Sequence, residues 1–344
     1  MLLCVKNAPP RFYITADSVI LKNCLSVQGG FMKGLELSYE FYRQYGEPML
    51  QKDFSHVLSV VAVGMAGSGS ECFGYDDELS RDHDFEPGFC IFIPDESVVD
   101  EKTAFELQRA YDKLPREFMG FSRSIDTPVG GRRNGVIRMA EFFTSKAGTP
   151  DGRLHKKEWF FVPEQGLLEA TNGRVFKDDS GEFTDIRQRL INMPRDVQLK
   201  KLAGNILTMG QAGQYNYNRC IGRGETAAAQ LAVTEFVKSA IHTIFLLNGE
   251  YMPYYKWCFK VLRDLSALGE LHSDLEYLIS SSNDEQNAIK KVMVIEDVCS
   301  KIVEQLRVQN LTTFNGAELE GHAYSVNNMI SDGEIRNLHI LYGV

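Results

Sequence analysis

The densest group of residues able to do chemistry lies between Gly67 and Asp84, in the sequence GSGSECFGYDDELSRDHD. Gly69 and Ser70 stand just after an apolar run, and glycine lets the backbone come close to a ligand. Successive backbone N–H groups together with a serine hydroxyl form a good seat for phosphate oxygens. A strand-to-helix turn that binds nothing has the same composition, so Gly69 and Ser70 do not identify a site on their own.

Asp82 and Asp84 are the second feature of this run. In an extended segment, residues two apart point to the same side, so the two carboxylates would share one face. Adjacent carboxylates repel each other, and Mg²⁺ removes the conflict, because this ion takes one or two carboxylates plus substrate phosphates. We therefore expect Asp82 and Asp84 to bind Mg²⁺. The alternative is a solvated acidic loop, which is the interpretation we give to the neighbouring Asp76, Asp77 and Glu78.

The order of these features favours phosphoryl chemistry. An apolar run at 57–63 precedes the Gly-Ser pair, and the Asp-x-Asp pair leads into a second apolar run at Phe89–Ile93. This order places phosphate donors and metal ligands at the ends of neighbouring strands, as metal-assisted nucleotidyl transfer requires. Other motifs fail: Cys72 breaks a GxGxxG pattern, and the sequence has no GxxxxGK[ST], GxSxG or HExxH.

The elements that must position these residues form an α/β half followed by a helical half. Apolar β-branched runs predict strands, and apolar residues at helical spacing predict helices. In the first half we predict helices at 32–51 and 100–111, strands at 57–63, 89–93 and 136–143, and a short strand or helix start at 158–162. In the second half we predict helices at 196–209, 226–247, 254–265 and 286–308. We thus expect an extension at 1–30, an α/β domain at 31–190 and an all-helical domain at 191–344.

The composition is that of a soluble globular protein, with 344 residues of which 44% are apolar and 24% charged. The net charge of −9 disfavours a general nucleic-acid binder. Seven widely spaced cysteines without a CxxC pair are typical of reduced thiols, so we expect a cytoplasmic protein. No uncharged apolar run approaches the ~20 residues of a membrane helix, and we expect no membrane partner.

Gly69-Ser70 followed by Asp82-His83-Asp84 resembles the GS…DxD signature of the polymerase-β-type nucleotidyltransferase superfamily. The longer string GSGSECFGYDDELSRDHDFEPGF, at 67–89, more closely resembles a bacterial domain-of-unknown-function family of predicted nucleotidyltransferases. Three further matching pieces follow in order: TNGRVFKD at 171–178, IGRGE at 221–225 and YMPYYKW at 251–257. The resemblance covers about residues 32–270, and the four pieces in order are much more specific than the short motif.

This resemblance implies a mixed-sheet α/β (α+β) catalytic domain followed by an all-helical domain. It implies that Gly69 and Ser70 bind the nucleoside triphosphate and that the Asp-x-Asp pair binds Mg²⁺. Many members of the superfamily use a third carboxylate on a later strand, and the segment GVIRMAEFF offers only Glu141 for that role. Arg138 stands nearby, where an acid is expected. This departure leaves open a two-carboxylate site or a module that binds nucleotide without turnover.

The helical half offers two candidate ligands of the nucleotide. Arg223, between two glycines, has a planar fork that suits phosphates, and an arginine at a helix end in water is the alternative. Lys256 stands in the aromatic-rich YMPYYKW segment and could reach the triphosphate. The aromatic residues around it are expected to pack at the seam between the halves.

Further charged residues allow more than one interpretation. Glu225 and Glu235 are candidate general bases for an acceptor hydroxyl, although a helical glutamate is far more often a solvated surface residue. The basic pair Arg132-Arg133, after two glycines, could meet an anionic acceptor or be plain surface.

The function that these features favour is Mg²⁺-dependent transfer of a nucleoside monophosphate from an NTP, foremost ATP, to an acceptor hydroxyl on a small molecule or a protein. An RNA acceptor is disfavoured by the acidic charge. A nucleotide sensor or interaction module without turnover is the alternative, and the missing third carboxylate favours it. A toxin–antitoxin component ranks third, because the second half lacks an arginine–histidine ribonuclease signature.

Overall fold

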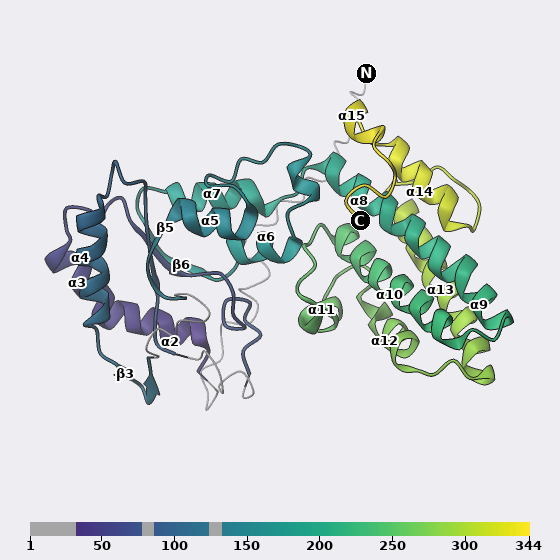
Figure 1. Ribbon diagram of the computed structural model, residues 1–344, viewed down its shortest axis with the longest axis horizontal. Helices are drawn as coiled ribbons and strands as arrows, with labels where there is room; N and C mark the ends of the chain where they lie inside the picture. The colour runs from purple at the N-terminus through teal and green to yellow at the C-terminus, as the bar shows by residue number, and fades with distance from the viewer. Residues whose placement is uncertain (1–31, 78–85, 124–132) are drawn as a thin grey trace, which may run out of the picture.

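The computed structural model describes residues 32–77, 86–123 and 133–344, and shows a sheet-containing half beside a helical half (Figure 1). The first half is built on a four-stranded sheet in the order β5–β2–β1–β6. Its strands are β1 (Ala62–Met65), β2 (Cys90–Ile93), β5 (Gly135–Arg138) and β6 (Arg174–Asp178). β1 pairs antiparallel with β2 and with β6, whereas β2 and β5 are parallel, so the sheet is mixed as expected. A small hairpin joins β3 (Glu117–Phe118) to β4 (Phe121–Ser122).

Both faces of the sheet are buried, because alternate strand residues enter two different apolar clusters. Val63 and Ile91 pack in one cluster with α2 (Gly34–Phe41), η2 (Tyr42–Gly46), α3 (Glu47–Asp53) and α4 (Glu101–Asp112). Ala62 and Phe92 pack in the other cluster with α5 (Met139–Ala147), α6 (Glu164–Thr171) and α7 (Glu182–Ile191). The sheet is therefore the middle layer between two groups of helices, seen on either side of it in Figure 1.

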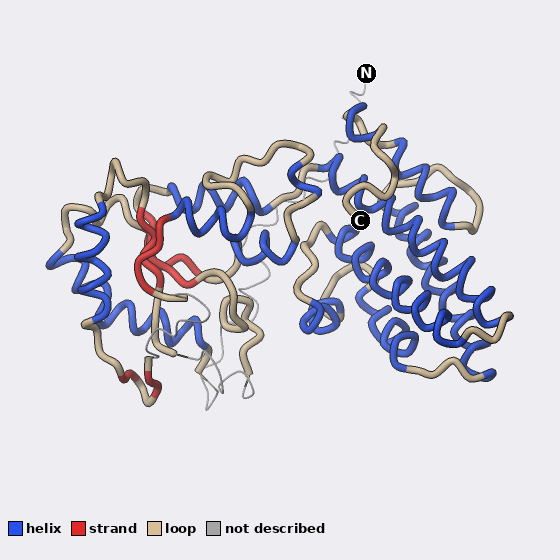
Figure 2. Tube along the Cα trace, in the orientation of Figure 1, coloured by secondary structure: helices blue, strands red, loops and turns tan. Residues whose placement is uncertain are grey.

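Every described element after β6 is a helix (Figure 2). The helical half contains α8 (Arg195–Met209), η5 (Gly210–Tyr217), α9 (Asn218–Gly222), α10 (Thr226–Asn248), α11 (Tyr255–Leu262), η6 (Gly269–Leu271), α12 (His272–Ser280), α13 (Glu285–Val308), α14 (Leu319–Asn328) and α15 (Gly333–Arg336). The change from strands and helices to helices alone therefore falls between β6 and α7, before the predicted boundary near residue 190.

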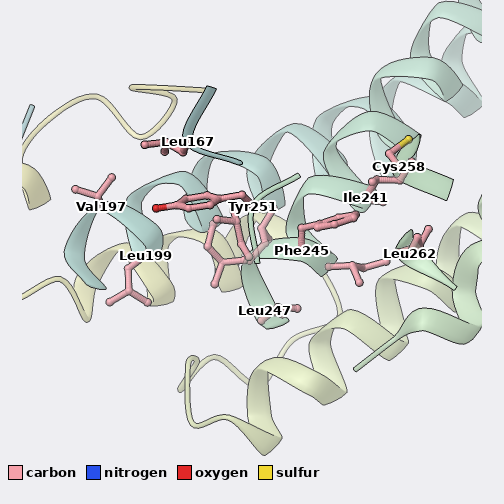
Figure 3. Packing of buried hydrophobic residues seen from close by; sticks show 14 of the residues in the cluster. Leu167, Val197, Leu199, Ile241, Phe245, Leu247, Tyr251, Cys258 and Leu262 are labelled. Atoms are coloured by element: carbon pink, nitrogen blue, oxygen red, sulfur yellow. The ribbon is translucent and has the colours of Figure 1, made fainter. Parts of the chain in front are cut away.

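The apolar core nevertheless continues across that boundary. The cluster that contains Ala62 and Phe92 extends through α5–α7 into α8 and α10. Figure 3 shows Tyr251 among residues of both halves, including Leu167 of α6 and Val197 of α8. The Tyr251 hydroxyl donates a hydrogen bond to the carbonyl of Leu190 at 2.8 Å. One continuous core thus holds the helical half against the layer that covers the sheet.

Helix α10 is the central helix of the second half. Within the described residues it is the one helix long and apolar enough to cross a membrane by length and composition. Much of it is buried in the protein, with Val233, Phe236 and Ile244 fully covered by neighbouring helices. Burial explains its apolar sequence and is consistent with a soluble protein.

The structure confirms the predicted helices and the strand at 89–93, and it corrects two other strands. Residues 55–60 form turns, so β1 begins only at Ala62 and the first part of the apolar run 57–63 is not a strand. In the predicted strand 136–143, β5 ends at Arg138 and α5 follows. The apolar residues from Met139 onward are spaced for the buried face of a helix, which a strand interpretation overlooks. The segment 158–162 begins with a 3₁₀ turn, η4 (Glu158–Phe160).

Candidate functional site

Four strand ends meet at one edge of the sheet. The register pairs Gly64 with Cys90, Met65 with Arg174, and Cys90 with Gly135. Because β1 runs opposite to the other three strands, its end lies beside their beginnings. We call the adjoining segments the strand-end site; they are 66–77 after β1, 86–89 before β2, 133–134 before β5 and 172–173 before β6.

Asn172 holds the first turn of the loop that follows β1. Its buried side chain accepts a hydrogen bond from the Gly67 N–H and donates one to the Gly67 carbonyl, both at 2.9 Å. The buried guanidinium of Arg187, from α7, donates to the carbonyls of Thr171 and Asn172. Burial lowers the pKa of Arg187 to about 10, which still leaves it charged at neutral pH. A positive charge therefore lies next to the residue that anchors the loop.

The turn leaves three consecutive backbone donors unpaired. The N–H groups of Ser68, Gly69 and Ser70, and the Ser70 hydroxyl, make no hydrogen bond to any other residue that the structure describes. Gly67 and Gly69 have φ angles of 112° and 135°, which residues with a side chain rarely adopt. The Ser70 carbonyl closes the turn by accepting a hydrogen bond from the Tyr75 N–H at 2.8 Å. Consecutive N–H groups in such a turn form a concavity that suits an anion.

Two cationic side chains flank this turn. The Arg133 guanidinium donates to the Ser68 carbonyl at 2.7 Å and forms an ion pair with Glu71. Lys146 Nζ, from α5, lies 2.8 Å from the Ser68 hydroxyl oxygen and 2.5 Å from a carboxylate oxygen of Glu169. Burial alone would raise the pKa of Glu169, but hydrogen bonds from Lys146 and Ser68 hold it below its usual value. The turn is therefore surrounded by positive groups whose charges are matched by carboxylates of the chain.

The helical half reaches the same loop through α11. The rings of Tyr75 and Trp257 pack with their centroids 5.1 Å apart, and Lys260 Nζ donates to the Tyr75 carbonyl at 3.4 Å. Lys256 Nζ lies 5.1 Å from the centroid of the Trp257 ring. The structure thus places Lys256 beside a side chain that contacts the loop carrying Gly69 and Ser70. Trp257 is part of the aromatic seam that the sequence predicts here.

A buried charge cluster fixes α6 against the helical half. One carboxylate oxygen of Glu164 lies 2.8 Å from His242 Nε2 and 3.1 Å from Lys201 Nζ, and the other accepts a hydrogen bond from the Met252 N–H at 2.9 Å. Burial alone would raise the pKa of Glu164, but His242 and Lys201 hold it at about 2. Since α6 also carries Glu169, this cluster positions one side of the strand-end site.

Asp82 and Asp84, the predicted Mg²⁺ ligands, lie outside the described residues. The described chain stops at Asp77 and resumes at Glu86, which accepts a hydrogen bond from the Asn134 side chain at 3.0 Å. Glu86 and Asn134 both belong to the strand-end site, so the described chain resumes at this edge of the sheet. Among residues 32–77, 86–123 and 133–344, no three His, Cys, Asp or Glu side chains are arranged to hold a metal ion.

Asp76 is not the solvated loop residue that the sequence suggested. It is 2% exposed, and its carboxylate accepts a hydrogen bond from the Gly34 N–H at 2.8 Å, at the beginning of α2. The other carboxylate oxygen lies 3.4 Å from Lys33 Nζ. Asp76 therefore ties the far end of the loop to α2, because an acid satisfies the free N–H groups of a helix start. Asp77 is exposed, as predicted.

Glu141, the candidate third carboxylate, lies on a helix and not on the predicted strand. It lies in the first turn of α5, after β5 has ended, and its side chain is exposed. Arg138 takes the end of β5, where its guanidinium donates to the carbonyls of Pro94 and Val99 and pairs with Glu101. The prediction for Glu141 rested on a strand that was expected to continue to residue 143. The chain forms the helix α5 there, and the side chain of Glu141 is directed toward solvent.

Arg223 is not brought to the strand-end site. It forms the C-terminal cap of α9, which Figure 1 shows at the end of the helical half remote from the sheet, whereas α11 is close to it. Glu225 is exposed at the beginning of α10, and Glu235 is half exposed and pairs with Lys238 at 3.7 Å. These three residues have the exposed positions that the alternative interpretation gave them.

The sequence interpretation missed Glu71 within the loop, and it missed four residues that shape the loop from other segments: Lys146, Glu169, Asn172 and Arg187. Asn172 lies within the TNGRVFKD piece, where its Asn-Gly pair precedes an alternating strand pattern, and this signal was available. Lys146, Glu169 and Arg187 carry no local signal, since an acid or a base on an amphipathic helix is usually solvated. Their role becomes visible only when α5, α6 and α7 are packed beside the loop.

Part of this chain is similar to a known protein family, and most of it can be compared with a solved structure. A family model described as "Domain of unknown function (DUF4037)" matches residues 159–258. This range contains the three later sequence pieces, TNGRVFKD, IGRGE and YMPYYKW, but not the glycine loop. No curated protein matches the chain. A solved structure of a nucleotidyltransferase-like protein from Exiguobacterium sibiricum 255-15 is similar at a TM-score of 0.35 and 10% identity, over 83% of this chain and 89% of that one. Residues 159–258 are thus similar to a family of unknown function, and the likeness to the solved structure is too weak to carry an argument.

Proposed function

We propose that this chain is a Mg²⁺-dependent nucleotidyltransferase, acting on ATP or another NTP in the cytoplasm. The acceptor oxygen would attack the α-phosphorus, the bond from that phosphorus to the bridging β-oxygen would break, and pyrophosphate would leave. The acceptor proton would pass to a base or to water. A hydroxyl of a small molecule or a protein is the acceptor class that the acidic surface favours over RNA.

The observation that carries this proposal is the set of unpaired donors at the turn after β1. Three consecutive N–H groups, at Ser68, Gly69 and Ser70, make no hydrogen bond within the described residues. A triphosphate offers several anionic oxygens at the spacing that such a turn accepts. The buried Arg187, which donates to backbone carbonyls, adds positive charge close to the same turn, and this favours an anion over a neutral ligand.

Magnesium is the ion that a pair of carboxylates beside a triphosphate would favour. Asp82 and Asp84 would hold the ion, and the described segments on either side of them adjoin the turn that would hold the phosphates. When bound, Mg²⁺ would neutralise charge that develops on the phosphoryl oxygens. The chain itself would position the substrate. The backbone of Ser68–Ser70 would orient the triphosphate, and Lys256 would bind it from α11. Exclusion of water would come from the contact between Tyr75 and Trp257.

The test is a pair of measurements on the full chain. Isothermal titration with a non-hydrolysable ATP analogue and Mg²⁺ measures binding, and pyrophosphate release from ATP with a mixed pool of hydroxyl acceptors measures turnover. We expect Asp82→Asn with Asp84→Asn to abolish Mg²⁺-dependent binding and release. Glu96→Gln removes an exposed acid beyond the opposite end of β2 and is the matched control, expected to behave as wild type. Equal nucleotide affinity in the aspartate variant and the wild type would refute the site.

A nucleotide sensor without turnover is the second candidate, and the exposed position of Glu141 on α5 favours it. A site with two carboxylates has one base fewer to accept the acceptor proton than a site with three. This candidate predicts binding that requires Asp82 and Asp84 but no pyrophosphate release from any acceptor pool. If Glu141→Gln were to abolish a release seen in the wild type, the sensor function would be excluded.

A further inference from the structure

Arg133 and Glu71 form an ion pair directly above the glycine of the phosphate turn. A Cβ atom built on Gly69 would overlap both the Arg133 guanidinium and the Glu71 carboxylate. The side chain of Glu71 is 9% exposed and that of Arg133 is 26% exposed. The pair is therefore part of the surface that a ligand on Gly69 and Ser70 would meet first.

Arg133 is attached to the turn by a second bond that does not involve Glu71. Its guanidinium also donates to the Ser68 carbonyl at 2.7 Å. A guanidinium presents five N–H donors in a planar fork, so release from one carboxylate leaves donors for another anion while the bond to Ser68 stays in place. Arg133 would then remain over the unpaired N–H groups of Gly69 and Ser70.

We propose that Arg133 is the triphosphate-binding arginine of this site and that Glu71 is an internal anion, which holds the guanidinium until phosphate oxygens displace it. This inference rests on the proposed function, because it specifies the ligand as a polyphosphate at the same turn. Arg133 is a binding residue, and Glu71 is a positioning residue that acts through it. Glu71 lowers the affinity of the free site for small anions and leaves the cation correctly placed.

The surroundings of Glu71 bring two ion pairs close in free energy: Arg133 with Glu71, and Arg133 with a phosphate group. A buried carboxylate is stable only while it is paired, and a charged guanidinium bonds phosphate at least as well as carboxylate. Burial raises the pKa of Glu71 even though Arg133 lowers it, which indicates that the pair only partly offsets the loss of solvent. A polyphosphate, which carries several negative charges, can therefore compete with a single carboxylate.

The contrasting pair in the same domain is Arg138 with Glu101. It lies where β2 and β5 end, at the opposite edge of the sheet, and Glu101 is 68% exposed. Arg138 is further fixed by the carbonyls of Pro94 and Val99, so it serves the fold. The two pairs have the same chemistry and different surroundings, and this makes Glu101→Gln a matched control.

The test is titration of the full chain with inorganic tripolyphosphate in the absence of Mg²⁺. If Glu71 occupies Arg133 for about nine-tenths of the time, Glu71→Gln tightens binding about tenfold. Arg133→Gln weakens it by roughly 10- to 100-fold, the value of a lost charge-assisted hydrogen bond, and Arg133→Lys restores part of it. Glu101→Gln leaves the affinity unchanged. Thermal unfolding of each variant identifies any loss of fold, and Glu71→Asp provides a second variant if Glu71→Gln does not fold.

The outcomes separate this inference from the proposed function. Tripolyphosphate binding that responds to Glu71 and Arg133, with no pyrophosphate release from any NTP, would support the anion exchange and count against the transferase. Pyrophosphate release that is unaffected by Arg133→Gln, with an unchanged Michaelis constant for the NTP, would overturn the exchange and leave the transferase standing. Equal tripolyphosphate affinity in wild type and Glu71→Gln would also overturn it.

Discussion

The side chain of Asn172 pairs with both backbone groups of Gly67, accepting from its N–H and donating to its carbonyl at 2.9 Å each. These two hydrogen bonds connect the segment before β6 to the turn after β1, across 105 residues of sequence. They determine where the turn that carries Gly69 and Ser70 stands relative to the sheet. A second asparagine, Asn248, makes the same pair of hydrogen bonds with Ala267 in the helical half.

Asn172→Asp tests this anchor, because aspartate keeps the shape and the acceptor but cannot donate to the Gly67 carbonyl. We expect a loss of about 1–3 kcal/mol in the free energy of unfolding, from a buried acceptor left unsatisfied, and weaker tripolyphosphate binding. Urea denaturation and isothermal titration measure the two effects. Asn248→Asp should cost a similar amount of stability without changing the tripolyphosphate affinity. A similar loss of affinity in both variants would mean that general destabilisation, not the anchor, is responsible.

Gly69→Ala tests the close approach of the ion pair to the backbone. The φ of 135° and the overlap with Arg133 and Glu71 both oppose a side chain here. We expect a destabilisation of about 1–3 kcal/mol and a marked loss of anion binding, since the turn must change its shape. Gly74→Ala is the control in the same loop, because Gly74 has a φ of 69° but open space around its Cβ position. It should cost stability alone, and wild-type binding by Gly69→Ala would contradict the assignment.

Glu164 predicts an acid-sensitive contact between α6 and the helical half. Its pKa is lowered from 4.5 to about 2, so its stabilising effect is fully present above pH 4.5 and is lost as the pH falls toward 2. Glu164→Gln leaves Lys201 without its carboxylate and should cost about 3–5 kcal/mol at neutral pH. The variant should also lose stability less steeply than wild type between pH 4.5 and 2. Chemical denaturation at a series of pH values measures the free energy of unfolding of the wild type and of Glu164→Gln. If the two free energies fell in parallel between pH 4.5 and 2, Glu164 would not be the responsible group.

Glu71 predicts a pH-dependent affinity for polyphosphate. Its pKa is raised by burial, and its charge faces Arg133 and, more distantly, Asp76 and the thiols of Cys72 and Cys90. Protonation of Glu71 neutralises the competing anion, so the wild-type affinity should approach that of Glu71→Gln as the pH falls. Dividing the two dissociation constants at each pH cancels the protonation of tripolyphosphate itself. A ratio that stays constant from acid to neutral pH would contradict the role of Glu71.

Local sequence was sufficient for most helices and for the position of the Gly-Ser turn. The helix at 226–247 was predicted correctly from apolar residues at helical spacing, and the strand at 89–93 from a short continuous apolar run that follows a Pro-Gly turn signal. The same method failed at 136–143, where Val136 and Ile137 are in a strand and Phe142 and Phe143 are in a helix. A window that spans both elements contains two periods, and Glu141 was assigned to the wrong one.

The grouping of charged residues around the turn required the folded chain. Arg133 and Glu71 are 62 residues apart, and Lys146 and Ser68 are 78 apart, so no local pattern relates them. Their proximity follows from the antiparallel pairing of β1 with β2 and β6, which brings one strand end beside three strand beginnings. Gly69 and Ser70 could be proposed as phosphate ligands from residue type alone, because glycine and a hydroxyl suit a turn that binds phosphate. The sequence alone did not show that Arg133 lies beside these two residues or that Glu71 pairs with Arg133, because both contacts depend on how the strands pair.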